Sequence, residues 1–193
     1  MKTTLLRPED YARSPWKNGG GIFTDIADAY RPGAKKDWDS LIWRFGRTPI
    51  VTPGPFSHLP GTDRLQMVVS GRGLVLKAPE QEFDEREPFR TVRFTGELEI
   101  VTRLEDGPVE VVNLMARRDA AEIELAALRE PGDRRIFTGT HLLYAACGDC
   151  VVRLDGEEFA IGGDSTLRIE LTDAVKLTLV SGLAVLGSIQ AGV

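Results

Sequence analysis

Cationic and amide side chains stand in three separate stretches of the chain, and together they could bind an anion. The middle stretch carries Arg64, at the start of a predicted strand over residues 63–69. Because side chains alternate along a strand, Arg64 shares one face with Gln66 and Val68. If that face lines a barrel, the guanidinium needs either a carboxylate partner, such as Asp63, or an anionic ligand. Bidentate geometry between arginine and a carboxylate favours a carboxylate ligand, and the alternative is a structural salt bridge or an exposed arginine.

The first stretch, over residues 15–21, reads Pro-Trp-Lys-Asn-Gly-Gly-Gly. Glycines permit close approach of the backbone, so backbone N–H groups could surround an anion. Lys17 would add charge and Asn18 a hydrogen-bonding arm. A tight turn before the next strand explains the same residues equally well. The spacing of a phosphate-binding loop is absent, so a nucleotide site is not predicted.

The last stretch, over residues 110–118, places an amide among apolar neighbours. Val111, Asn113 and Met115 share one face of the predicted strand. A buried asparagine must be hydrogen-bonded, either to the backbone or to a ligand. Asn113 is therefore a further candidate ligand-binding residue.

Residues 54–71 resemble a cupin barrel motif, in which Arg64 stands where a metal-binding glutamate is usual. A metal cupin also needs several histidines, and this chain has two, His58 and His141. Because arginine stays charged and only donates hydrogen bonds, it repels a divalent cation. We therefore predict no metal and no cofactor. His58 is kept as a ligand-binding candidate or an acid–base group.

Composition excludes several classes of partner. The chain has 193 residues and a net charge of −5, without a basic run, so nucleic acid is not an expected partner. The start of the chain lacks a secretory apolar segment, and the apolar run over residues 177–189 is too short to cross a bilayer. We expect no membrane partner and a cytoplasmic location.

Short runs of strand-forming residues separated by turn signals predict an all-β protein. Residues 67–76 are echoed by residues 144–153, and this repeat indicates two similar β-domains in tandem, residues 1–118 and 119–193. Aligning the two copies puts His141 where the first half has Arg64.

Three other segments allow more specific expectations. The cysteines of Cys147-Gly-Asp-Cys150 are interpreted as residues of a hairpin with a two-residue turn, in preference to a redox or zinc pair. Residues 119–129 suit either a helix or a strand. The acidic run over residues 78–88 is interpreted as a solvated insertion.

Four motifs in order along the first 120 residues or so resemble the HutD/Ves family of bicupin proteins. They are Pro15 to Gly21 with Thr24 and Asp25; Trp43 with Arg44; Gly54 to Arg64; and Asn113 and Met115 with Arg117 and Arg118. The resemblance implies two tandem cupin-like jelly-roll barrels without the usual metal ligands, and it adds Arg44 to the candidate site. His58 lies at a position that varies in the family. The family name links it to bacterial histidine utilisation, in which urocanate and formyl- or formimino-glutamate are small carboxylates.

Three functions follow as hypotheses. The first is binding of a small anionic metabolite in the N-terminal barrel, as a regulatory or accessory function. The candidate ligand-binding residues are Lys17, Asn18, Arg44, His58, Arg64 and Asn113. The second is a metal-independent enzyme, such as an isomerase, that uses Lys17 or His58 as acid–base group. The third is a scaffold whose barrels serve dimerisation, and a homodimer is compatible with all three.

Overall fold

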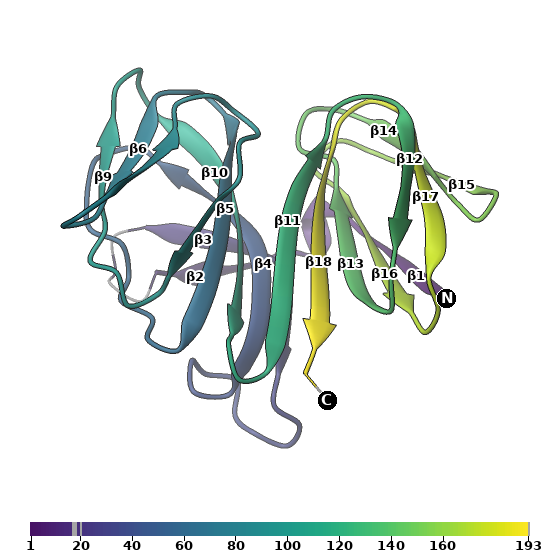
Figure 1. Cartoon of the computed structure of the whole chain (residues 1–193), viewed down its shortest axis with the longest axis horizontal. Coiled ribbons are helices and arrows are strands. Elements are labelled where there is room, and N and C mark those ends of the chain that lie inside the picture. The colour runs from purple at the N-terminus through teal and green to yellow at the C-terminus, as the bar shows by residue number, and fades with distance from the viewer. Residues whose placement is uncertain (17–18, 20, 193) are drawn as a thin grey trace. The chain divides into compact units, whose positions relative to one another are not determined.

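The computed structural model describes residues 1–16, 19 and 21–192, and nearly all of its regular structure is β-strand. It falls into two compact units (Figure 1). The N-terminal barrel comprises Ala12–Ile123 together with Gly192, and the C-terminal barrel comprises Met1–Tyr11 and Glu124–Ala191. The all-β prediction is therefore confirmed. Among the described residues, no helix has the length and apolar character needed to cross a membrane.

The N-terminal barrel is built from a larger and a smaller antiparallel sheet. The larger sheet has the strand order β2-β3-β4-β10-β5-β8, and the smaller has the order β7-β6-β9. The strands are β2 (Ala12–Pro15), β3 (Ile22–Tyr30), β4 (Leu41–Ile50), β5 (Thr62–Ser70), β6 (Leu74–Lys77), β7 (Glu82–Glu85), β8 (Val92–Thr95), β9 (Val101–Leu104) and β10 (Val109–Arg117).

The C-terminal barrel repeats this plan, with strand orders β1-β16-β13-β18-β11 and β12-β17-β14-β15. Its strands are β1 (Lys2–Leu6), β11 (Ala121–Leu128), β12 (Gly132–Ile136), β13 (Gly139–Tyr144), β14 (Cys150–Leu154), β15 (Glu157–Ile161), β16 (Thr166–Leu171), β17 (Val175–Ser181) and β18 (Ala184–Ala191). A short 3-10 turn, η1 (Pro8–Asp10), follows β1. The internal repeat in the sequence therefore corresponds to two sheets of similar strand order.

The first strand does not belong to the N-terminal barrel, which differs from the predicted division at residue 118. β1 pairs antiparallel with β16, from Lys2 opposite Glu170 to Leu6 opposite Thr166, and it lies beside that strand in Figure 1. It thereby forms the edge of the larger sheet of the C-terminal barrel. Pairing of an edge strand across more than 150 residues leaves no local signal in the sequence, and the predicted boundary missed it for that reason.

The repeated glycine turns connect two sheets, and the hairpin interpretation of Cys147 and Cys150 is wrong. β13 ends at Tyr144 in one sheet, and β14 begins at Cys150 in the other, so these strands do not pair with each other. The same holds for β5 and β6 in the first half. Gly71 and Gly148 both have positive φ, +74° and +80°, which suits a tight change of direction.

Two segments that the sequence left open or misjudged are strands. Residues 119–129 contain β11, whose buried and exposed residues alternate at first as in a half-buried strand. Residues 78–88, predicted to be a solvated insertion, contain β7, which pairs with β6 from Leu74 opposite Glu85 to Lys77 opposite Glu82. The solvated-insertion interpretation is therefore wrong for β7.

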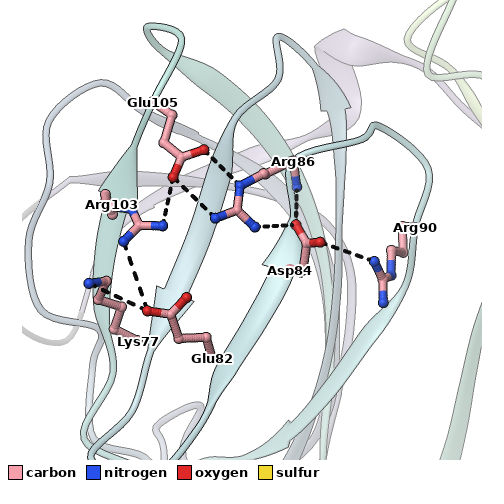
Figure 2. Close-up of polar contacts among 7 residues, drawn as sticks. All are labelled: Lys77, Glu82, Asp84, Arg86, Arg90, Arg103 and Glu105. Atoms are coloured by element: carbon pink, nitrogen blue, oxygen red, sulfur yellow. Dashed lines mark hydrogen bonds and ion pairs between the residues drawn. The ribbon is translucent and has the colours of Figure 1, made fainter.

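The outer face of the smaller sheet explains why so acidic a segment forms a strand. Exposed side chains of both charges form a chain of ion pairs across β7, β6 and β9 and their flanking residues (Figure 2). The residues are Lys77, Glu82, Asp84, Arg86, Arg90, Arg103 and Glu105. Each exposed pair contributes only about 0–1 kcal/mol, and one of them, between Lys77 and Glu82, joins β6 to β7. Because strand side chains alternate, Glu85 then lies on the inner face, where its exposed fraction is 0%.

Candidate functional site

Three neighbouring strands place polar residues on the inner face of the N-terminal barrel. β10 lies between β4 and β5, and Asn113 is opposite Gly46 on β4 and opposite Gln66 on β5. Arg64 is opposite Met115 on β10 and opposite Phe94 on β8. The inward orientation of Arg64 and Gln66 is the one that strand alternation predicts.

These side chains line a small cavity in the N-terminal barrel, with a volume of about 40 Å³. The cavity lies between two apolar clusters: Ile50 and Phe56 belong to one, and Phe23, Leu59 and Met115 to the other. Its lining residues are Trp16, Phe23, Trp38, Arg44, Thr48, Ile50, Phe56, Ser57, Leu59, Arg64, Gln66, Asn113 and Met115. An apolar pocket with a few convergent polar groups is typical of small-molecule sites.

Arg64 is a buried cation whose contacts are mostly with neutral groups. Its side chain Nη2 donates a hydrogen bond to Asn113 Oδ1 at 3.2 Å, and the guanidinium lies over the rings of Phe56 and Phe94, at 4.8 and 5.0 Å. Its Nε is buried and has no hydrogen-bond acceptor among the described residues. Asp63, considered above as its partner, instead pairs with Arg93 and Arg118. Arg64 therefore has unused capacity to donate hydrogen bonds.

A second buried ionisable group, Glu85, lies on the other side of Gln66. Gln66 Nε2 donates to Glu85 Oε2 at 2.8 Å, while Gln66 Oε1 and Glu85 Oε1 have no partner among the described residues. Burial raises the pKa of Glu85 from 4.5 to about 8, against the opposing effects of Gln66 and Arg64. Burial also lowers the pKa of Arg64 to about 10, with the charge of Glu85 acting in the opposite direction. Near neutral pH, Glu85 is mostly protonated and Arg64 is charged.

Arg44 also lines the cavity, but its charge is already compensated. Its Nε pairs with Asp25 Oδ1 and its Nη2 donates to Ser14 Oγ, which itself donates to Asp25 Oδ2 at 2.8 Å. The guanidinium lies 4.2 Å from the ring centroid of Phe23 and 5.3 Å from that of Trp38. Thr24-Asp25 and Trp43-Arg44, two of the motifs singled out in the sequence, are thus joined by one buried ion pair. Arg44 positions the aromatic wall and has less capacity left for a ligand than Arg64.

The glycine-rich stretch contributes Trp16 to the cavity. Trp16 Nε1 donates to Thr48 Oγ1 at 2.9 Å, and Thr48 in turn donates to the carbonyl of Ile22 at 2.6 Å. The indole is therefore held by a satisfied hydrogen bond at the cavity wall. Lys17 and Asn18, both predicted to contact the ligand, lie outside the described residues.

His58 is placed differently from the prediction. Its side chain is exposed on the connection between β4 and β5 and is not part of the cavity lining, whereas the preceding Ser57 is. No contact of His58 with the cavity supports it as ligand or acid–base group.

Three residues that line the cavity, Trp38, Phe56 and Gln66, and one behind it, Glu85, were not predicted as site residues. Trp38 and Phe56 are aromatic walls, and Gln66 and Glu85 form the hydrogen-bonded pair behind Arg64. Alternation along β5 places Gln66 on the same face as Arg64, so the sequence could have indicated Gln66 as a site residue. Glu85 carries no such signal, because the residues around it are charged on both faces of the strand.

His141 aligns with Arg64 in the internal repeat, and both nitrogens of its imidazole have hydrogen-bond partners. Its Nε2 lies 2.8 Å from the carbonyl of Phe137 and its Nδ1 lies 2.8 Å from Ser188 Oγ. Since the carbonyl can only accept, Nε2 carries the proton and Nδ1 accepts from Ser188. The C-terminal barrel thus has an imidazole with both nitrogens hydrogen-bonded at the position that aligns with Arg64 in the first barrel.

His141 should make folding stability depend on pH. Burial lowers its pKa from 6.5, so the unfolded chain binds more protons as pH falls past that value. We expect the free energy of unfolding to fall between pH 7 and 5 by a contribution that His141→Gln removes. Urea denaturation of the two proteins at several pH values measures this. Equal pH dependence in both would contradict it.

Within residues 1–16, 19 and 21–192, no three His, Cys, Asp or Glu side chains lie close enough together to bind a metal ion. Two tandem barrels, each of one larger and one smaller antiparallel sheet, with a largely apolar cavity inside the first, define a cupin-like two-barrel protein. The HutD family model matches residues 8–186, and the chain belongs to the HutD family.

Similar proteins agree with this assignment. An uncharacterized 21.2 kDa protein in the hutC 3' region of Pseudomonas putida is 31% identical over 172 residues, which cover 88% of this chain and 87% of the relative. The solved structure of HutD from Pseudomonas fluorescens SBW25 has a TM-score of 0.81 at 23% identity over 100% of both chains. A conserved protein of unknown function from Pseudomonas aeruginosa PAO1 has a TM-score of 0.84, again at 23% identity over 100% of both chains. The predicted family and the cupin-like fold are confirmed.

Proposed function

We propose that the N-terminal barrel binds a small carboxylate through Arg64. The observation that carries the proposal is a buried guanidinium with one neutral hydrogen-bond acceptor, Asn113, and an Nε without any among the described residues. A charge held away from water is costly unless it is paired, and a bound carboxylate would supply that pairing with bidentate geometry. The aromatic walls of Trp16 and Phe56 would contact the rest of a small, flat ligand.

The cellular role that we propose is regulatory or accessory, within histidine utilisation. It is supported by membership of the HutD family and by the P. putida relative, whose name places it in the hutC 3' region. Intermediates such as urocanate and formimino-glutamate carry the carboxylate that Arg64 could bind. The location of such a function would be cytoplasmic.

Calorimetry with a panel of acids tests the proposal. The panel contains urocanate, formylglutamate, formimino-glutamate and formate, and urocanate and formylglutamate are each compared with the neutral amide of the same shape. We expect at least one acid to bind and its amide to bind at least tenfold more weakly, because only the charged group gains from Arg64. Absence of binding by every acid, or equal binding of acid and amide, would contradict the proposal. Turnover of a bound acid would instead favour the metal-independent enzyme.

A further inference from the structure

Among the buried polar atoms of the N-terminal barrel that lack a hydrogen-bond partner among the described residues, three lie in adjoining side chains of the inner face: Arg64 Nε, Gln66 Oε1 and Glu85 Oε1. Each lies in a side chain exposed by 7% or less. An unpartnered buried polar atom costs about 1–3 kcal/mol, so three in adjoining side chains are unusual in a core. Both Arg64 and Gln66 line the cavity, and a ligand there could complete their hydrogen bonds.

The hydrogen bond between Gln66 and Glu85 fits two protonation states. When Glu85 is ionised, the Gln66 amide donates to it, and the Gln66 carbonyl is left for the cavity. When Glu85 is protonated, its O–H can donate to the Gln66 carbonyl at the same heavy-atom distance, 2.8 Å. The carboxamide then turns by about 180° and leaves its NH₂ group for the cavity. The proton on Glu85 thus decides whether Gln66 offers the cavity an acceptor or a donor.

We propose that Glu85 is a specificity-determining residue, which makes the cavity accept an anion when it carries a proton and disfavours one when it does not. This inference rests on the proposed function and deepens it, because it makes a bound proton part of anion binding. With Glu85 protonated, the barrel offers an uncompensated Arg64 and a second donor from Gln66. When Glu85 is ionised, its negative charge compensates the charge of Arg64, and Gln66 turns a carbonyl oxygen towards the anion.

The protonation of Glu85 depends mainly on its burial and on two neighbouring side chains, Gln66 and Arg64. Arg64 on β5 is the charged group that acts on it, while Leu74, its partner on β6, is apolar. The flanking Asp84 and Arg86 belong to the outer-face ion pairs (Figure 2). Burial raises the pKa of Glu85 to about 8, so its proton is lost as pH rises through that value, and anion affinity should fall in the same range.

Titration of the ligand-free protein tests the first half of the inference. Carbon-13 NMR of the glutamate carboxyls between pH 5 and 9.5 should show one midpoint near pH 8. The Gln66 side-chain amide signals should shift with the same midpoint. Glu85→Gln should remove this titration, and the matched control Glu82→Gln, from the exposed face of the same strand, should keep it. A Glu85 midpoint near 4.5, or Gln66 signals that do not follow Glu85, would overturn the inference.

Formate affinity tests the second half, because formate stays ionised throughout this range. In the wild-type protein we expect the Kd from an NMR titration to rise about tenfold between pH 7 and pH 9, as one linked proton requires. In Glu85→Gln it should change less than twofold. Formate binding that is independent of pH in the wild type, or equally dependent in Glu85→Gln, would overturn this inference alone. If formate and the other acids of the panel bind at no pH, the proposed function fails, and this inference fails with it.

Discussion

Arg64→Met is expected to weaken carboxylate binding by 100-fold or more while the protein remains folded. Methionine keeps an unbranched side chain but cannot donate hydrogen bonds. A carboxylate would lose charge-assisted hydrogen bonds worth about 1.5–3 kcal/mol each, and a 100-fold change corresponds to about 2.7 kcal/mol. Calorimetry with the best-binding acid of the panel measures the effect.

The stability of Arg64→Met should change little, in contrast with its binding. The substitution removes the cost of burying a charge whose Nε lacks an acceptor, but it leaves Asn113 Oδ1 without its donor. These effects oppose each other, and we expect the free energy of unfolding to change by less than about 2 kcal/mol. Arg93→Met, on the outward face of β8, is the matched control and should bind normally. Undiminished binding by Arg64→Met would contradict the proposed role of this side chain.

Asp25→Ala is expected to lower the free energy of unfolding by about 3–5 kcal/mol, because it leaves the buried Arg44 without a counter-charge. The side chains of Arg44 and Asp25 are only 8% and 9% exposed, and Ser14 completes the group. Urea denaturation at pH 7 measures the change.

Two comparisons separate the loss of a partner from a general effect of the substitution. Asp106→Asn weakens an ion pair with Arg72 whose side chains are 54% and 71% exposed, and it should cost less than about 1 kcal/mol. The double variant Asp25→Leu with Arg44→Met removes both charges and should be more stable than Asp25→Ala alone. A cost below about 1 kcal/mol for Asp25→Ala would show that Arg44 finds another partner or reaches water.

Strand alternation accounts for what could be predicted of the site. Arg64 and Gln66 are two residues apart on β5, and Asn113 lies among apolar residues on β10, so their faces follow from the sequence. The pairing of β10 with both β4 and β5 then brings them together. Arg44 entered through a family motif, and the structure shows that Asp25 already compensates its charge.

The remaining features depend on contacts that the sequence does not encode locally. Glu85 lies in a run of charged residues, and only the pairing of β7 with β6 decides which of these faces inward. β1 is joined to the C-terminal barrel by its register with β16, far along the chain. His58 has the residue type of a functional group, but its exposed position on a connection keeps it out of the cavity lining.

A crystal structure with the best-binding acid of the panel tests the central claim most directly. We predict that the carboxylate lies inside the N-terminal barrel, with its oxygens at about 2.7–2.9 Å from the guanidinium nitrogens of Arg64, the distance of a charge-assisted hydrogen bond. Trp16 and Phe56 should contact the remainder of the ligand. A carboxylate bound elsewhere on the protein, with only water against Arg64, would contradict the claim.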